Sequence, residues 1–138
     1  MKLFEKSTLR ATAVAISLGF ALQASSYAAD SRVKAIDVQQ GKSMNRNGAL
    51  LLDVREPDEY HQGHAPGSVL IPLGQLKSRL REIRAFESKP IAIICRSGRR
   101  SAQAAEILSQ SGFADVSNVQ GGMLAWEMAA LPIVKRGK

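Results

Sequence analysis

The chain has one cysteine, few aromatic residues and no internal repeat. A single cysteine excludes an intramolecular disulfide and a zinc site built from several cysteines. The counts of 11 glycines and 5 prolines exclude collagen-like and low-complexity classes. The lack of a repeat excludes solenoids and propellers. Because 45% of its residues are hydrophobic, the chain is not wholly disordered, and its length of 138 residues predicts one domain.

The N-terminal segment lacks a hydrophobic run long enough to anchor the chain in a membrane. Residues 11–22 carry no charge, but these twelve residues fall short of the about 20 that span a bilayer. Basic residues precede the run and a small-x-small pattern ends at Ala28, which is typical of a cleavable secretory signal peptide. We therefore expect residues 1–28 to be a signal peptide. Residues 29–138 would then be exported to the bacterial periplasm, free of the membrane; a eukaryotic secretory route is the alternative.

The charge of the chain is positive, +7 in total. It falls to +5 when residues 1–28 are removed, because they hold three basic residues and one acidic residue. Such an excess suits nucleic acid, an anionic surface or a small anionic substrate. The basic stretch 77–84 has no interleaved aromatic residues, and aromatics make up only 5% of the chain. We therefore expect no nucleic-acid partner.

Short apolar runs alternate with helical patterns along the chain. Five runs are candidate strands, at residues 33–38, 50–54, 69–72, 91–95 and 116–119. Apolar residues at three- and four-residue spacing predict helices over 73–83, from the segment after Cys95 to Gly112, and after Gly121. In the last of these, Trp126 is expected to pack with Leu124 and Met128. The alternation predicts an α/β domain around a parallel sheet.

Cys95 ends the most apolar of these runs, at the edge where parallel sheets bind ligands. It opens the segment that we call the Cys95 loop, Cys95-Arg96-Ser97-Gly98-Arg99-Arg100-Ser101. Gly98 allows a sharp turn, and successive backbone N–H groups beside a helix N-terminus form a cradle for an anion. The three arginines add positive charge around this cradle, and the combined field of N–H groups and arginines favours the nucleophilic thiolate. An inert buried cysteine is the alternative, but arginines are rarely buried without a partner.

Three segments resemble motifs of the rhodanese family of sulfurtransferases. The Cys95 loop is similar to the active-site loop of that family, residues 52–72 to its upstream motif, and residues 119–126 to its closing motif. They come in the family's order and spacing and cover residues 33–132. The resemblance implies a single rhodanese-like domain, with a five-stranded parallel sheet flanked by helices on both faces.

The resemblance also implies an activity. Cys95 would attack the outer sulfur of thiosulfate and hold that sulfur as a persulfide for an acceptor, cyanide or a thiol. The implied substrate-binding residues are Arg96, Ser97, Gly98, Arg99 and Arg100. Arg96 and Arg99 are expected to attract the thiosulfate dianion, whereas Arg100 closes the loop and is a candidate structural residue. No metal or cofactor is expected.

Two other functions stay open on the same fold. Phosphatases and arsenate reductases related to rhodaneses use a wider loop, with an arginine six residues after the cysteine. Here that residue is Ser101, and Arg100 comes one residue earlier. The second alternative is a non-catalytic module that carries persulfide sulfur for a partner, since Cys95 would serve either role.

Other polar residues near the upstream motif have structural interpretations. Asp53 and Arg55 are expected to form an ion pair or to anchor a loop, and contact with the substrate is the alternative. Residues 56–59, Glu-Pro-Asp-Glu, predict the start of a helix. His61 and His64 lack the further ligands that a metal site needs, and the resemblance implies that His64 stabilises a loop.

Overall fold

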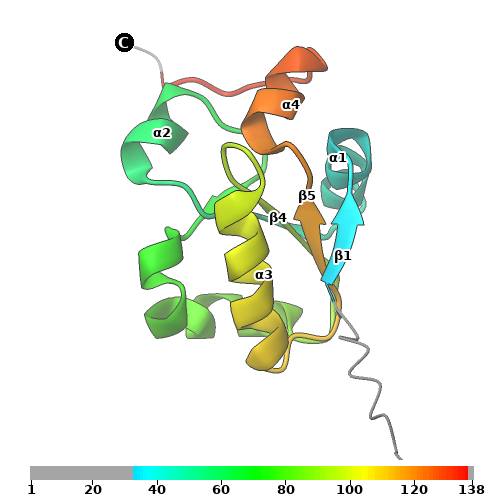
Figure 1. Ribbon diagram of the computed structural model, residues 1–138, viewed down its shortest axis with the longest axis vertical. Coiled ribbons are helices and arrows are strands. Elements are labelled where there is room, and N and C mark those ends of the chain that lie inside the picture. The colour runs from blue at the N-terminus through cyan, green and yellow to red at the C-terminus, as the bar shows by residue number, and fades with distance from the viewer. Residues whose placement is uncertain (1–32, 137–138) are drawn as a thin grey trace, which may run out of the picture.

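The computed structural model describes residues 33–136. Its strands are β1 (Val33–Ile36), β2 (Leu50–Asp53), β3 (Val69–Leu70), β4 (Ile91–Ile94) and β5 (Val116–Val119). Its helices are α1 (Val38–Arg46), α2 (Pro57–Gln62), α3 (Arg99–Gln110) and α4 (Gly122–Met128), with two 3-10 helices, η1 (Leu73–Gln75) and η2 (Lys77–Phe86). All five strands run parallel in one sheet, in the order β1-β5-β4-β2-β3. Figure 1 labels β1, β5 and β4 of this sheet. This confirms the predicted α/β fold.

The predicted signal peptide, residues 1–28, lies outside the described residues. Its cleavage and the export of the chain therefore stay predictions of the sequence. Within residues 33–136, no helix combines the length and the apolar character that crossing a membrane requires.

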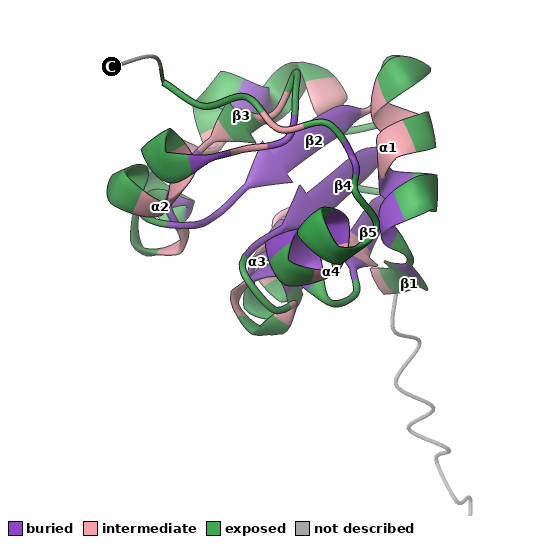
Figure 2. Cartoon of the chain, turned by 90° about the horizontal axis from the view of Figure 1, so that it is seen from above, coloured by how far each residue is buried: buried purple, intermediate pink, exposed green. Residues whose placement is uncertain are grey.

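The two faces of the sheet are covered by different helices, as predicted. Side chains alternate along a strand, so Ile91, Ile93 and Cys95 join the core that packs against α3 and η2. Ala92 and Ile94 join the core on the other face, which includes residues of α1 and α4. Figure 2 shows buried residues gathered in the sheet and exposed residues on the outer sides of the helices. The central strand β4 is therefore buried on both faces.

The first helix, α1, was not predicted. β1 ends at Ile36 because Asp37 caps this helix. The Asp37 carboxylate accepts a hydrogen bond from the backbone N–H of Gln40 at 2.8 Å, and the Gln40 side chain accepts one from the N–H of Asp37 at 2.9 Å. This reciprocal pair is a capping box, whose Asp-x-x-Gln spacing is visible in the sequence.

In place of the single helix predicted over residues 73–83, the structure has the two 3-10 helices η1 and η2, which are of the tighter type. Their hydrogen bonds close over three residues, as from the Arg79 N–H to the Leu76 carbonyl oxygen at 3.1 Å. Leu76 and Ile83 are buried, as the apolar pattern required. Spacings of three and four residues suit both helix types, so the pattern did not distinguish them.

The packing partners predicted for Trp126 are wrong. Leu124 is 41% exposed and Met128 is 88% exposed, whereas Met123 is buried in the same core cluster as Trp126. Positions 123 and 126 are three residues apart and so share the inner side of α4. The Trp126 indole N–H donates to the carbonyl oxygen of Pro132 at 2.9 Å, which ties down the chain that leaves α4.

Candidate active site

Cys95 lies at the carboxyl edge of the sheet, directly after β4. Its side chain is buried, whereas Arg96, Ser97 and Arg99 of the Cys95 loop are exposed. In Figure 1 this loop stands above the first turn of α3, between α2 and α4. The nucleophile predicted from the sequence therefore sits where a surface loop meets the core.

The Cys95 loop wraps around its own sulfur. Gly98 has a φ of 100°, a conformation that favours glycine, and its N–H donates to Sγ at 3.1 Å. The Ser101 hydroxyl oxygen lies 3.3 Å from Sγ. Burial raises the pKa of the Cys95 thiol, but hydrogen bonds from the Ser101 hydroxyl and from the N–H groups of Ser101, Gly98 and Ser97 outweigh it. The pKa therefore lies below its ordinary value of 9.0, which favours the thiolate.

The lowered pKa of Cys95 agrees in direction with the anion cradle predicted from the sequence. The hydrogen bonds of the loop lower this pKa. The pKa of Arg100 is raised by its hydrogen bond to Glu59 and also by the charge of Cys95, so Cys95 and Arg100 also interact electrostatically. The guanidinium of Arg100 is bound by the Glu59 carboxylate, at 2.6 and 2.7 Å. Arg100 thus links α3 to α2, which fits the structural role for which it was a candidate. Arg96 and Arg99 have no ion-pair partner among the described residues.

The ion pair of Glu59 with Arg100 predicts a pH-dependent contribution to stability. The hydrogen bond from Arg100 outweighs desolvation and lowers the pKa of Glu59 from 4.5 to about 2. Because the pKa is lower in the folded state, this contribution is complete above about pH 4.5 and is lost as the pH falls towards 2. The side chains are 31% and 30% exposed, so solvent screening leaves about 1 kcal/mol.

We therefore expect Glu59→Gln to lower the free energy of unfolding by about 1 kcal/mol near pH 6, measured by urea unfolding. The difference from the wild type should shrink as the pH falls from about 5 to about 2.5. Glu106→Gln, at an exposed position on α3, is the matched control. A difference that does not change with pH would contradict this assignment.

The start of α4 supports the Cys95 loop through backbone contacts. The Met123 N–H donates to the carbonyl oxygen of Cys95 at 2.8 Å, and the Leu124 N–H donates to that of Arg96 at 3.0 Å. Gly122, with a φ of 55°, permits this approach: a Cβ there would lie 2.4 Å from the Cys95 carbonyl oxygen. The closing motif of the sequence thus brings a glycine against the backbone of the loop.

The predicted ion pair of Asp53 and Arg55 is confirmed. Both side chains are buried, and Arg55 Nη2 lies 2.8 Å from Asp53 Oδ2. The same nitrogen donates to the carbonyl oxygen of Gly63 at 2.8 Å. The pair therefore joins the end of β2 to the end of α2, the helix that carries Glu59.

His64 holds a loop in place. Its ring stacks on that of Tyr60 with centroids 3.7 Å apart, and its Nδ1 lies 2.9 Å from the Tyr60 carbonyl oxygen. Its backbone pairs with Val134, which anchors the C-terminal segment. Within residues 33–136, no three His, Cys, Asp or Glu side chains are grouped to hold a metal ion.

Three polar residues of the site were not predicted as functional: Glu59, Ser101 and Asn118. Ser101 lies within the Cys95 loop, and its oxygen is 2.7 Å from Asn118 Oδ1. An asparagine within a strand is unusual, and this was the available signal for Asn118. Glu59 carried no such signal, because its partner Arg100 is far away in the sequence.

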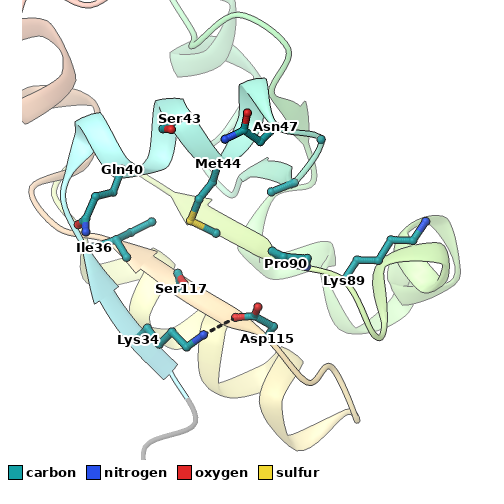
Figure 3. Close-up of a pocket in the computed structure, with 12 residues that line it drawn as sticks. Lys34, Ile36, Gln40, Ser43, Met44, Asn47, Lys89, Pro90, Asp115 and Ser117 are labelled. Atoms are coloured by element: carbon teal, nitrogen blue, oxygen red, sulfur yellow. Dashed lines mark hydrogen bonds and ion pairs between the residues drawn. The ribbon is translucent and has the colours of Figure 1, made fainter.

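Two cavities lie at opposite edges of the sheet. One, of about 570 Å³, borders the Cys95 loop at Arg96, and its charged lining residues also include Arg55, Glu59, Glu127 and Lys135. The other, of about 590 Å³, lies beside α1 at the amino ends of the strands. Figure 3 shows it, with Lys34 and Asp115 paired at 2.9 Å in its lining. Of these two cavities, only the first has a residue of the Cys95 loop, Arg96, in its lining.

Fold and site together define a class of protein: a parallel α/β domain that holds one cysteine, with a lowered thiol pKa, in a cradle of backbone N–H groups. The chain matches the Rhodanese-like domain family over residues 37–129, and it belongs to this family. The resemblance seen in the three sequence motifs is thereby confirmed.

The relatives include named sulfurtransferases. Thiosulfate sulfurtransferase GlpE of Pseudomonas syringae is 36% identical over 93 residues, which are 67% of this chain and 86% of that protein. The Bacillus subtilis protein YrkF is 49% identical over 76 residues, 55% of this chain, but the chain spans only 40% of its length. A crystal structure of a rhodanese-related protein from Thermoplasma volcanium is 34% identical. It aligns with a TM-score of 0.66 over 75% of this chain and 99% of that one.

Proposed function

We propose that this chain is a thiosulfate sulfurtransferase that carries sulfur as a persulfide on Cys95. The observation that carries the proposal is the position of Cys95 Sγ. It accepts a hydrogen bond from the N–H of Gly98, the N-cap of α3, at 3.1 Å, and the pKa of the Cys95 thiol is lowered. The likeness to GlpE of Pseudomonas syringae, a thiosulfate sulfurtransferase by name, supports the choice of donor.

In the first half-reaction, the Cys95 thiolate attacks the outer sulfur of thiosulfate. A bond forms between this sulfur and Sγ, the bond between the two sulfurs of thiosulfate breaks, and sulfite leaves with the electron pair. No general base is needed if Cys95 reacts as the thiolate, the form that its lowered pKa favours, and no general acid is needed because sulfite is a stable anion. Arg96 and Arg99 attract the dianion, and the N–H groups of the loop stabilise charge on the outer persulfide sulfur.

In the second half-reaction, cyanide or a thiol attacks the outer sulfur of the persulfide. The bond from that sulfur to Sγ breaks, and Cys95 leaves as the thiolate. The chain has no second cysteine, so the persulfide cannot be resolved within the chain and must be passed to another molecule.

The loop geometry favours sulfur transfer over oxyanion chemistry. An arginine six residues after the cysteine would seat a tetrahedral oxyanion, but this position is occupied by Ser101. Arg100, one residue earlier, is bound by Glu59. The shorter loop therefore fits the sulfurtransferase assignment.

Incubation with thiosulfate alone is expected to add one sulfur atom to the intact protein, measured by mass spectrometry. Cyanide should then remove it as thiocyanate. Cys95→Ser is expected to abolish the gain in mass and to reduce thiocyanate formation by about 10³-fold or more, because it removes the nucleophile. Hydrolysis of an aryl phosphate without sulfur uptake would instead support an oxyanion enzyme. Sulfur uptake without transfer to cyanide or thiols would leave a carrier module.

The same assay tests the role of the exposed arginines. Arg99→Ala is expected to raise the KM for thiosulfate about tenfold with little change in kcat, since it removes an attraction felt before the reaction. Arg81→Ala removes the same charge from an exposed position on η2 and should leave KM unchanged. Equal effects would assign the attraction to net charge rather than to the place of Arg99.

The signal-peptide pattern in residues 1–28 supports a periplasmic location for this chemistry. Cleavage and export are tested by producing the full-length chain in a Gram-negative host and measuring the mass of the protein in each cell fraction. We expect a protein of residues 29–138 in the periplasmic fraction. An uncleaved chain in the cytoplasm would contradict export.

A further inference from the structure

The Ser101 hydroxyl has two acceptors but only one proton. Its oxygen lies 2.7 Å from Asn118 Oδ1 and 3.3 Å from Cys95 Sγ. A hydroxyl donates one hydrogen bond, so Ser101 cannot donate to both acceptors at once. The second contact of Asn118 sets its orientation: Nδ2 donates to the Gly98 carbonyl oxygen at 3.2 Å, which leaves Oδ1 facing Ser101.

Asn118 is held in this position by the sheet. It pairs in register with Ile93 of β4, two residues before Cys95, and it is half-buried. Asparagine is disfavoured in strands, and its side-chain bonds go to Ser101 and Gly98, both in the Cys95 loop. The backbone of Asn118 therefore takes part in the pairing of β5, while its side chain bonds to the Cys95 loop.

We propose that Asn118 is a positioning residue that acts on Cys95 through the Ser101 hydroxyl. When Cys95 is a thiol, its S–H donates to Ser101 Oγ, and the Ser101 proton is bonded to Asn118 Oδ1. When Cys95 is a thiolate, the Ser101 proton turns to Sγ and leaves Asn118 Oδ1 without it. Asn118 therefore competes with the thiolate for one proton.

For the persulfide state, this inference rests on the proposed function. In a persulfide the negative charge lies on the outer sulfur, so Sγ becomes a weak acceptor. The Ser101 proton then returns to Asn118 Oδ1. Asn118 thereby stabilises the sulfur-loaded state relative to the thiolate from which it forms.

A substitution of Asn118 leaves the charges around Cys95 in place. The charged side chains of the packed elements are either paired or exposed: Arg100 with Glu59, Asp53 with Arg55, and the exposed Arg96 and Arg99. The hydrogen bonds from α4 to the loop come from its backbone N–H groups, and its charged residue Glu127 is exposed and lines a cavity together with Arg96. A changed thiol pKa in an Asn118 variant therefore reports hydrogen bonding.

The test uses the single cysteine of the chain. The rate of alkylation by iodoacetamide as a function of pH reports the pKa of Cys95 alone, whether or not sulfur transfer takes place. Asn118→Leu, similar in size, removes the competing acceptor. We expect it to lower the pKa of Cys95 by about half to one unit relative to the wild type.

The control repeats the Asn118→Leu substitution in a Ser101→Ala variant. In that background it should not lower the pKa of Cys95, because no hydroxyl proton remains to be shared. Loss of the Asn118 bond to Gly98 affects both backgrounds, so the difference between them isolates the route through Ser101. Equal shifts in the two backgrounds would overturn the proposal and leave Asn118 as a tether of the loop.

Thermal unfolding checks that each variant folds, and Asn118→Ala replaces Asn118→Leu if the latter does not. The thiosulfate mass assay separates this inference from the proposed function. If Asn118→Leu lowers the pKa of Cys95 only when Ser101 is present, but thiosulfate adds no sulfur, the proposed function is refuted and the role of Asn118 stands. If thiosulfate adds sulfur, but the pKa shift is the same in both backgrounds, the role of Asn118 is refuted and the proposed function stands.

Discussion

Gly122→Ala is expected to lower the free energy of unfolding by about 3–5 kcal/mol and to displace the Cys95 loop. The added Cβ would lie 2.4 Å from the Cys95 carbonyl oxygen and 2.6 Å from the carbonyl carbon and oxygen of Arg96. These are backbone atoms, so no side-chain rotation relieves the collision. The φ of 55° adds strain for any residue with a Cβ. Urea unfolding measures the loss, and the alkylation rate of Cys95 reports the loop.

Two other glycines separate backbone strain from collision. Gly48 has a φ of 94° but no atom within 4 Å of an added Cβ, and Gly74 has open space with no positive φ. Gly48→Ala is therefore expected to cost about 1–2 kcal/mol, and Gly74→Ala less than about 0.5 kcal/mol. If Gly122→Ala lowered the free energy of unfolding no more than Gly48→Ala does, the conclusion that α4 supports the Cys95 loop would be wrong.

Asp53→Ala is expected to cost about 3–5 kcal/mol of stability, because it leaves a buried guanidinium without its counter-charge. Asp53 is 0% exposed and Arg55 is 5% exposed, so water cannot replace the lost carboxylate. Arg55 also holds the carbonyl oxygen of Gly63, and its displacement should loosen α2. Chemical unfolding at neutral pH measures the effect.

The matched control for Asp53→Ala is a surface ion pair. Glu82→Ala removes one partner of the pair with Arg79, whose side chains are 52% and 34% exposed, and should leave the Tm unchanged. The double variant Asp53→Ala with Arg55→Met removes both buried charges and should recover much of the loss. A single Asp53→Ala variant as stable as Glu82→Ala would show that the buried pair contributes nothing.

The class of fold and the place of the nucleophile could be predicted because both depend on neighbours in the sequence. The apolar run 91–95 predicts a buried strand whatever elements pack against it. Cys95 comes at the end of this run and therefore lies at the carboxyl edge of a parallel sheet. Gly98, three residues after Cys95, marks the turn, which the structure shows with a φ of 100°. The family motifs then specified the activity to be tested.

Some local features escaped because their pattern suits more than one structure. The apolar spacing over 73–83 indicates a helix but not its type, since 3.0 and 3.6 residues per turn place nearly the same residues inward over a short span. Trp126 was assigned the wrong partners for a related reason. Which side of α4 is buried depends on where that helix begins against the loop.

By itself, the sequence determined the strands, the cysteine at the end of the central strand and the basic glycine-containing loop, because periodicity and turn chemistry act over a few residues. Only the tertiary structure decided what activates the thiol. Asn118 reaches Ser101 through the pairing of β5 with β4, and Glu59 reaches Arg100 from another helix. The sequence placed loop N–H groups and arginines around Cys95, and the structure adds the Ser101 hydroxyl to the groups that lower its pKa. The reason is physical: a hydrogen bond depends on distances of a few tenths of an ångström, and packing sets these distances.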